Sequence, residues 1–371
     1  MKTRILRLII NIISIVCICV VIYSFIPISY MVRHVNENRK NFAGFYNEKE
    51  NTLDMVYVGG SACFLSYQPL RSWNKYGFTS YNLAHNSPTP QSIKYYMEEA
   101  EKTQNPQLFL VDLRPFQYGE NPGWDKKYKI METESYIRNG ADSMKYSYTR
   151  YKLINESVKD KEKRLYYHLD FFKYKSRLQT LLSKILLSES KKDINNLVEF
   201  DYMDNEEDIR TKGYQFADKT AKRKFTDFSN VTEIGTLDHE VHQKFIDLLE
   251  YCKEKEHKVL FIVHSYLQAK SHKIRYNYMK EVIEQYGFDF LNTNDYYKEI
   301  GLDYSKDFYD NNHTNVFGAE KYTDFVAKYI DEKYNLPDKR GDEAFSDWNT
   351  CYDEFVVKTE KSKKAINKLI K

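Results

Sequence analysis

Apart from its first seven positions, this 371-residue sequence has no excess of basic residues. Outside the first seven residues, which include Lys2, Arg4 and Arg7, basic and acidic side chains are equal in number. Nucleic-acid-binding proteins need a concentrated basic face, so this balance argues against that class. A content of 42% hydrophobic and 29% charged residues is typical of a globular protein and excludes a disordered chain.

Cysteine is also scarce, and the five cysteines follow no paired spacing, which argues against a small disulfide-stapled domain: Cys17, Cys19, Cys63, Cys252 and Cys351. A zinc motif is missing as well. His239 and His242 flank a glutamate, but the metalloprotease spacing is His-Glu-x-x-His, and no third ligand is nearby. We therefore expect no metal site and no cofactor.

Charge is absent altogether from Leu8 to Ile28, a run dominated by Ile, Val and Leu. A helix of that length can cross the roughly 30 Å hydrocarbon layer of a membrane. A cleaved secretory signal is the alternative, but its apolar core is shorter and ends in a small-residue cleavage site. We expect an uncleaved anchor over residues 1–32. The basic residues at its start favour a cytoplasmic N-terminus and place the rest of the chain outside the cell membrane.

Beyond the anchor, apolar runs of strand length alternate with helical patterns. The runs Leu108–Val111 and Val259–Val263 are unbroken, which is typical of strands buried on both faces. The stretches that follow carry apolar residues at a spacing near 3.6, as amphipathic helices do. The alternation predicts an α/β domain with a parallel sheet, built from residues 33–118 and 236–335.

The remaining segments lack strong strand patterns. Residues 119–235 are charged and tyrosine-rich, and they predict a helical insertion over one edge of the sheet. The insertion is either a cap on a ligand site or an elaboration without a direct role. Residues 336–371 predict a C-terminal amphipathic helix with a basic end.

Two separated motifs carry the groups of a possible catalytic site. The stretch VYVGGSACF places Gly59, Gly60 and Ser61 at the end of a buried strand, where glycines permit a sharp turn and close approach of a substrate. Far along the chain, Asp310 and His313 are three residues apart just before a helix. A carboxylate on one ring nitrogen leaves the other free to deprotonate a serine hydroxyl. Each motif alone is more often structural, but together they predict a Ser-His-Asp triad.

The order and placement of these motifs resemble the SGNH (GDSL-like) hydrolases. Within that family the chain is most similar to the membrane-anchored envelope branch, which includes DltD-like and alginate O-acetylation-like proteins. The resemblance covers about residues 54–116 and 237–332. It implies a three-layer, flavodoxin-like fold with a parallel sheet. It also implies that Ser61 is the nucleophile, His313 the general base and then acid, and Asp310 the orienting carboxylate.

The sequence departs from the family at the oxyanion hole, the group of donors that stabilises the transition state. Gly60 stands where Gly-Asp-Ser would carry its aspartate. Ser87 takes the place of the glycine whose backbone N–H is one donor, and a backbone N–H does not require glycine. The usual Gly-x-Asn is replaced by a block with Asp112 and Arg114. Arg114 is expected either to donate to an oxyanion, to bind an anionic substrate or simply to pair with Asp112.

For other polar residues near these motifs, we expect supporting roles at most or a place in the pocket wall. His264 follows a strand at the functional edge, and His85 lies beside the oxyanion block; each either lines the pocket or is a satisfied, buried histidine. Asn312 and Asn315 are expected to hold the loop around His313 through backbone hydrogen bonds.

The expected function is serine-dependent acyl-ester chemistry at the outer face of the cell membrane. The resemblance implies an esterase or an O-acyltransferase that acts on a cell-envelope polysaccharide or a teichoic-acid-like polymer. A multi-pass membrane acyltransferase would then be a partner that supplies the acyl group. The alternative is a non-catalytic SGNH-like envelope scaffold that binds glycan, since the Gly-x-Asn block is missing.

Overall fold

The computed structural model describes residues 2–25, 38–117, 134–169 and 210–370. Parts of the predicted insertion, residues 118–133 and 170–209, lie outside this range, as does the connector 26–37. The chain divides into two compact units, one made of residues 1–37 and 160–204 and the other of residues 38–159 and 205–371.

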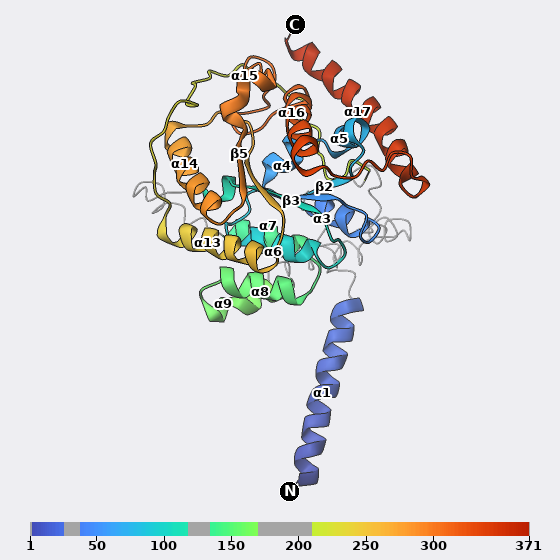
Figure 1. Cartoon of the computed structure of the whole chain (residues 1–371). Helices are drawn as coiled ribbons and strands as arrows, with labels where there is room; N and C mark the ends of the chain where they lie inside the picture. Colours follow the sequence, from blue (N-terminus) through green and yellow to red (C-terminus); the bar gives the residue numbers. More distant parts are fainter. Residues whose placement is uncertain (1, 26–37, 118–133, 170–209, 371) are drawn as a thin grey trace. The chain divides into compact units, whose positions relative to one another are not determined.

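In the first unit, α1 (Lys2–Phe25) is the predicted apolar helix, drawn in dark blue in Figure 1. Its segment Arg4–Val21 has a mean hydropathy of 2.4 and buries none of its surface, so by length and composition it can cross a membrane. A signal sequence near an N-terminus has the same properties. The unit also contains the short helix α9 (Lys161–His168), which begins at the N-cap Asp160.

The second unit is built on a five-stranded sheet in which every neighbouring pair is parallel. The strand order is β2-β1-β3-β4-β5, and this sheet confirms the predicted α/β class. The strands are β1 (Met55–Gly59), β2 (Ser80–Ala84), β3 (Leu108–Asp112), β4 (Val259–Val263) and β5 (Asp289–Asn292). The first four are buried along their whole length, as the apolar runs of β1, β3 and β4 require; β2 is buried although it contains Ser80 and Asn82.

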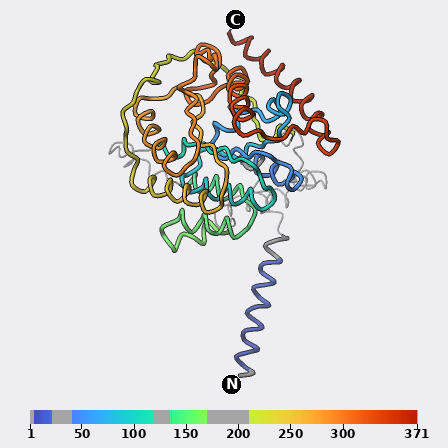
Figure 2. Tube along the Cα trace, in the orientation of Figure 1, coloured from blue at the N-terminus to red at the C-terminus, as the bar shows by residue number. Residues whose placement is uncertain are grey.

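Helices cover both faces of this sheet (Figures 1 and 2). On one face, α4 (Ser61–Ser66) and α16 (Val316–Tyr334) enclose a hydrophobic core cluster with the sheet, and α5 (Pro69–Tyr76) and the long α17 (Ser346–Ile370) lie beside them. The other elements are α3 (Asn38–Tyr46), α6 (Ser92–Ala100), α7 (Glu134–Ser143), α8 (Tyr148–Ser157), α13 (His239–Glu254), α14 (Lys270–Gln285), α15 (Tyr297–Ile300) and the 3₁₀ turns Arg114–Phe116, Thr293–Tyr296 and Glu343–Phe345.

The edge strand β2 is covered by the chain that returns to the sheet at residue 210. The Asn82 N–H donates to the Lys212 carbonyl at 3.1 Å, and the Asn41 side chain donates to the Gly213 carbonyl at 3.1 Å. Covering an edge in this way removes a row of unpaired backbone groups.

The strand order also fixes where a ligand can reach the sheet. From β1 the chain proceeds to β2 on one side and then crosses back to β3 on the other, so the direction of winding reverses between β1 and β3. In open α/β sheets, ligands bind outside the carboxyl ends of the strands at such a switch point. The residues that follow Gly59 and Asp112 are therefore placed at the usual ligand crevice.

Candidate active site

Ser61 lies at the junction between β1 and α4, one residue beyond the N-cap Gly60. The turn depends on Gly59 because no larger residue fits there. A Cβ at this position would lie 2.4 Å from the Asp112 Cβ and 2.5 Å from the Cys63 Sγ. The absence of a side chain lets β1 run against the end of β3 and then turn at once into the helix that begins with Ser61.

His313 and Asp310 lie in a tight loop before α16. The Tyr309 N–H donates to the His313 carbonyl at 3.0 Å, and a single antiparallel bridge joins Phe308 to Thr314. Asn315 ends the loop as the N-cap of α16, since its side-chain oxygen accepts from the Phe317 and Gly318 N–H groups. The Asn315 N–H also donates to the Asp307 carbonyl at 2.9 Å, so backbone hydrogen bonds close the loop and the Asn315 side chain joins it to α16.

The three predicted triad residues come together, although 252 positions separate Ser61 from His313. The Ser61 Oγ lies 2.8 Å from the His313 Nε2. The His313 Nδ1 lies 2.9 Å from both carboxylate oxygens of Asp310. Because an ionised carboxylate can only accept, Nδ1 carries the proton and the Nε2 lone pair faces the serine hydroxyl. This is the arrangement in which a histidine can deprotonate a serine.

The carboxylate of Asp310 is held in its charged form. Partial burial acts to raise its pKa, but hydrogen bonds from His313 and from the Asn312 N–H outweigh that effect and lower the pKa below the usual 3.8. Asp310 therefore stays ionised at neutral pH and can stabilise the imidazolium that forms when His313 takes a proton.

A cavity of about 150 Å³ opens beside Ser61 and His313. Three further predicted site residues, Gly60, Ser87 and Arg114, line it together with Ala62, Pro88, Asp112, Pro115, Gln117 and Asn312. Asp310 lies behind His313 and does not line the cavity. The structure thus brings all six predicted site residues to one place.

Backbone N–H groups are available around this cavity. The N–H groups of Ser61 and Ala62 belong to the first turn of α4, where a helix offers no intrahelical acceptor. Ser87 has a φ of +51°, the left-handed conformation that favours glycine, and its N–H donates no hydrogen bond to any residue the structure describes. These amides are candidate donors to an oxyanion.

Arg114 does not pair with Asp112 through its guanidinium. The Asp112 carboxylate instead accepts the backbone N–H groups of Arg114 at 3.1 Å and Gly60 at 3.4 Å. The guanidinium donates to both carbonyl oxygens of Asn312, at 3.1 Å and 2.6 Å, and its Nη1 lies 3.1 Å from the His264 Nε2. Asn312 therefore binds the Arg114 side chain. The sequence predicted only that Asn312 supports its own loop.

The two histidines with open expectations are both buried and do not line the cavity. Burial lowers the pKa of His264, and its Nδ1 faces the Asp112 carboxylate at 3.5 Å. Burial also lowers the pKa of His85 to about 4, and its Nδ1 lies 2.9 Å from the Asn86 carbonyl, next to Ser87. Both rings are neutral at physiological pH and support the residues around the cavity.

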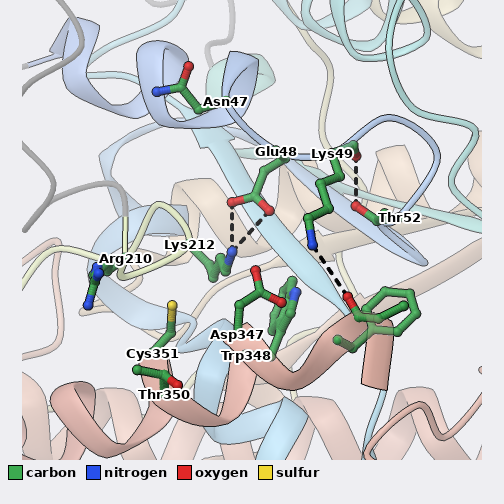
Figure 3. Close-up of a pocket in the computed structure, with 12 residues that line it drawn as sticks. Asn47, Glu48, Lys49, Thr52, Arg210, Lys212, Asp347, Trp348, Thr350 and Cys351 are labelled. Atoms are coloured by element: carbon green, nitrogen blue, oxygen red, sulfur yellow. Dashed lines mark hydrogen bonds and ion pairs between the residues drawn. The ribbon is translucent and has the colours of Figure 1, made fainter. Parts of the chain in front are cut away.

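A second, larger cavity of about 320 Å³ has different walls (Figure 3). Glu48 and Lys212 form a buried ion pair there, with N–O distances of 2.9 and 3.0 Å, and the Lys212 ammonium lies 4.4 Å from the centre of the Trp348 ring. The start of α17 closes this cavity, which has no residue in common with the one beside Ser61. In the described ranges, no group of three or more His, Cys, Asp or Glu side chains is placed to hold a metal ion.

No protein-family model matches this chain, and no curated protein matches it.

Proposed function

We propose that this chain is an SGNH-type serine esterase or O-acyltransferase, held in the cell membrane by α1 with its catalytic unit on the outer side. The observation that carries the proposal is the continuous Ser61–His313–Asp310 relay at a sheet switch point. The strand order 2-1-3-4-5 supports it, because flavodoxin-like sheets have this order.

The chemistry follows from the positions of the protons. The Ser61 Oγ attacks the carbonyl carbon of an ester while its proton moves to the His313 Nε2. The carbonyl oxygen becomes an oxyanion, which the N–H groups of Ser61, Ala62 and Ser87 can stabilise. His313 then returns the proton to the leaving alcohol, and an acyl group stays on Ser61. Water or a sugar hydroxyl then attacks the acyl carbon while its proton moves to the His313 Nε2. His313 passes this proton to the Ser61 Oγ as the bond between Ser61 and the acyl group breaks.

The size of the cavity favours a short acyl group such as acetyl. Its volume of about 150 Å³ is well below the roughly 300–1,000 Å³ of pockets that enclose a drug-sized ligand. The acyl group fits inside while the alcohol part stays outside, which suits a long polymer such as an envelope polysaccharide or a teichoic-acid-like chain. A multi-pass membrane protein that delivers acyl groups from the cytoplasmic side would be the partner for transfer.

Hydrolysis of phenyl acetate by the full-length protein in detergent tests the proposal. We expect turnover that is lost in Ser61→Ala and in His313→Ala, with both variants folded. Addition of a short oligosaccharide should divert acetyl groups to its hydroxyls if the protein is a transferase. Folded native protein without turnover would instead favour the alternative, a non-catalytic SGNH-like scaffold.

A further inference from the structure

Arg114 is a cation in the wall of the cavity, and it has no anionic partner among the residues that the structure describes. No carboxylate of a described residue lies within 4 Å of its guanidinium nitrogens. Its three side-chain hydrogen bonds go to the two oxygens of Asn312 and to the Nε2 of His264. An arginine of this kind usually pairs with a carboxylate or phosphate, because its planar fork matches both.

The acceptors around Arg114 do not compensate its charge. The Asn312 oxygens belong to amides. His264 is neutral, since burial lowers its pKa, with Arg114 itself acting in the same direction. The Asp112 carboxylate lies 3.5 Å from the His264 Nδ1, the ring nitrogen that does not face Arg114. The guanidinium therefore lines the cavity, and no carboxylate from the described part of the chain pairs with its positive charge.

The position of the guanidinium is fixed from several sides. The Tyr266 ring centre lies 4.6 Å from the Arg114 Cζ, and the same ring stacks on His264 with centroids 5.1 Å apart. Tyr266 is itself held by Tyr276 at 3.2 Å and Gln117 at 3.3 Å. A side chain that is already ordered loses little entropy when it binds a ligand.

Part of the hydrogen-bonding capacity of Arg114 remains available. Its bonds use Nη1 twice and Nη2 once, so that the Nε–H and one Nη2–H have no acceptor among the described residues. The amides of Ser61, Ala62 and Ser87 already offer donors for an oxyanion. A ligand anion is therefore a better match for the free N–H groups than the reacting oxygen.

We propose that Arg114 selects esters that carry a carboxylate or phosphate close to the ester bond. This inference rests on the proposed function, because it names the substrate class of the same cavity. The negative group sits on either the acyl part or the alcohol part of the substrate. Asn312, His264 and the Tyr266 ring position the guanidinium for this contact.

Three esters separate the possibilities when the full-length protein is assayed in detergent. Phenyl acetate is neutral, 2-carboxyphenyl acetate carries its charge on the alcohol part, and monophenyl succinate carries it on the acyl part. Native protein should prefer one of the charged esters. Arg114→Gln should lower kcat/KM for that ester by about 10- to 100-fold, mainly through KM, because charge-assisted hydrogen bonds are the strong ones. Turnover of phenyl acetate should fall by a smaller factor, which reflects only the lost contact of Arg114 with Asn312 in the catalytic loop, and Arg114→Lys should restore part of the preference for the charged ester.

Exposed Arg340, which pairs with Asp338, gives the matched control Arg340→Gln, for which no change is expected. Equal losses on neutral and charged esters in Arg114→Gln would overturn the proposal and indicate an oxyanion or structural role. So would a native enzyme with no preference for a charged ester.

Anion binding is also measured without turnover, as the rise in Tm that inorganic phosphate or acetate produces. A rise in native protein that disappears in Arg114→Gln supports the anion site, and the more effective anion shows whether phosphate or carboxylate is favoured. If that rise is seen while no ester is hydrolysed, the proposed function fails and the anion site stands. If neither anion shifts the Tm and no charged ester is preferred, the anion site is overturned.

Discussion

Replacing Gly59 by alanine should destabilise the protein strongly, because the turn that presents Ser61 has no room for one methyl group. The new Cβ would lie 2.4 Å from the Asp112 Cβ and 2.5 Å from the Cys63 Sγ, both fully buried. Ordinary contacts begin near 3.4 Å, so each neighbour must move by about 1 Å. Overpacking of this kind costs about 1–3 kcal/mol.

The displacement of Asp112 adds a second penalty. Its buried carboxylate accepts the Gly60 and Arg114 N–H groups, and weakening such bonds costs about 1–3 kcal/mol more. We expect Gly59→Ala to lower the free energy of unfolding by about 2–6 kcal/mol, a large part of the 5–15 kcal/mol typical of a domain. Urea unfolding followed by tryptophan fluorescence measures the loss.

The neighbouring glycine provides the matched control. A Cβ on Gly60 would meet nothing closer than the Pro88 Cδ at 3.3 Å, so Gly60→Ala should cost under about 1 kcal/mol. Adding Cys63→Ala to Gly59→Ala should recover part of the loss, because it removes one of the two clashes. If Gly59→Ala unfolds at the same urea concentration as native protein, the steric explanation of the turn is wrong.

Three further perturbations test other parts of the structure. Ser87→Gly should raise the free energy of unfolding by about 0.5–1 kcal/mol, because serine is strained at a φ of +51°. A lower free energy of unfolding in urea would contradict this. Acidification from pH 6.5 to about 4 should lower the free energy of unfolding by up to about 3 kcal/mol through His85. The imidazole of the unfolded chain binds a proton below pH 6.5, whereas the buried ring has a pKa of about 4 and binds it only near that pH. In His85→Gln, the Tm should therefore depend less on pH over this range. Glu48→Ala should cost about 3–5 kcal/mol because it leaves Lys212 buried and unpaired, and Glu48→Leu combined with Lys212→Met should recover most of that loss in the same assay.

The sheet could be predicted from the sequence because its strands are marked by local patterns. Leu108–Val111 and Val259–Val263 are unbroken apolar runs, and both are buried strands in the structure. Burial on both faces requires such runs, so the signal is contained within each segment. The position of Ser61 after β1 follows in the same way from two adjacent glycines.

The surroundings of Arg114 could not be predicted because they depend on residues far apart in the sequence. Asn312 lies 198 positions from Arg114, and His264 lies 150 positions away. Nothing local distinguishes an asparagine that supports its own loop from one that holds an arginine across the cavity. The left-handed conformation of Ser87 also had no local signal, since serine rarely adopts it.

The triad is an intermediate case. The residue types and the Asp-x-x-His spacing suggested that Asp310 and His313 act together, but either motif alone is more often structural. Only the strand order brings Ser61 within 2.8 Å of the imidazole. The contact therefore depends on topology, which the sequence indicates only through the alternation of strands and helices.

Reaction of the full-length protein with a fluorophosphonate probe, followed by mass spectrometry of its peptides, tests most directly whether Ser61 is a nucleophile. We predict that Ser61 is the single modified residue and that Ser61→Ala and His313→Ala are not modified. The control variant Ser305→Ala, which removes an exposed serine, should be modified at Ser61 as the native protein is. Folded native protein that stays unmodified, or that is modified at another serine, would contradict the account.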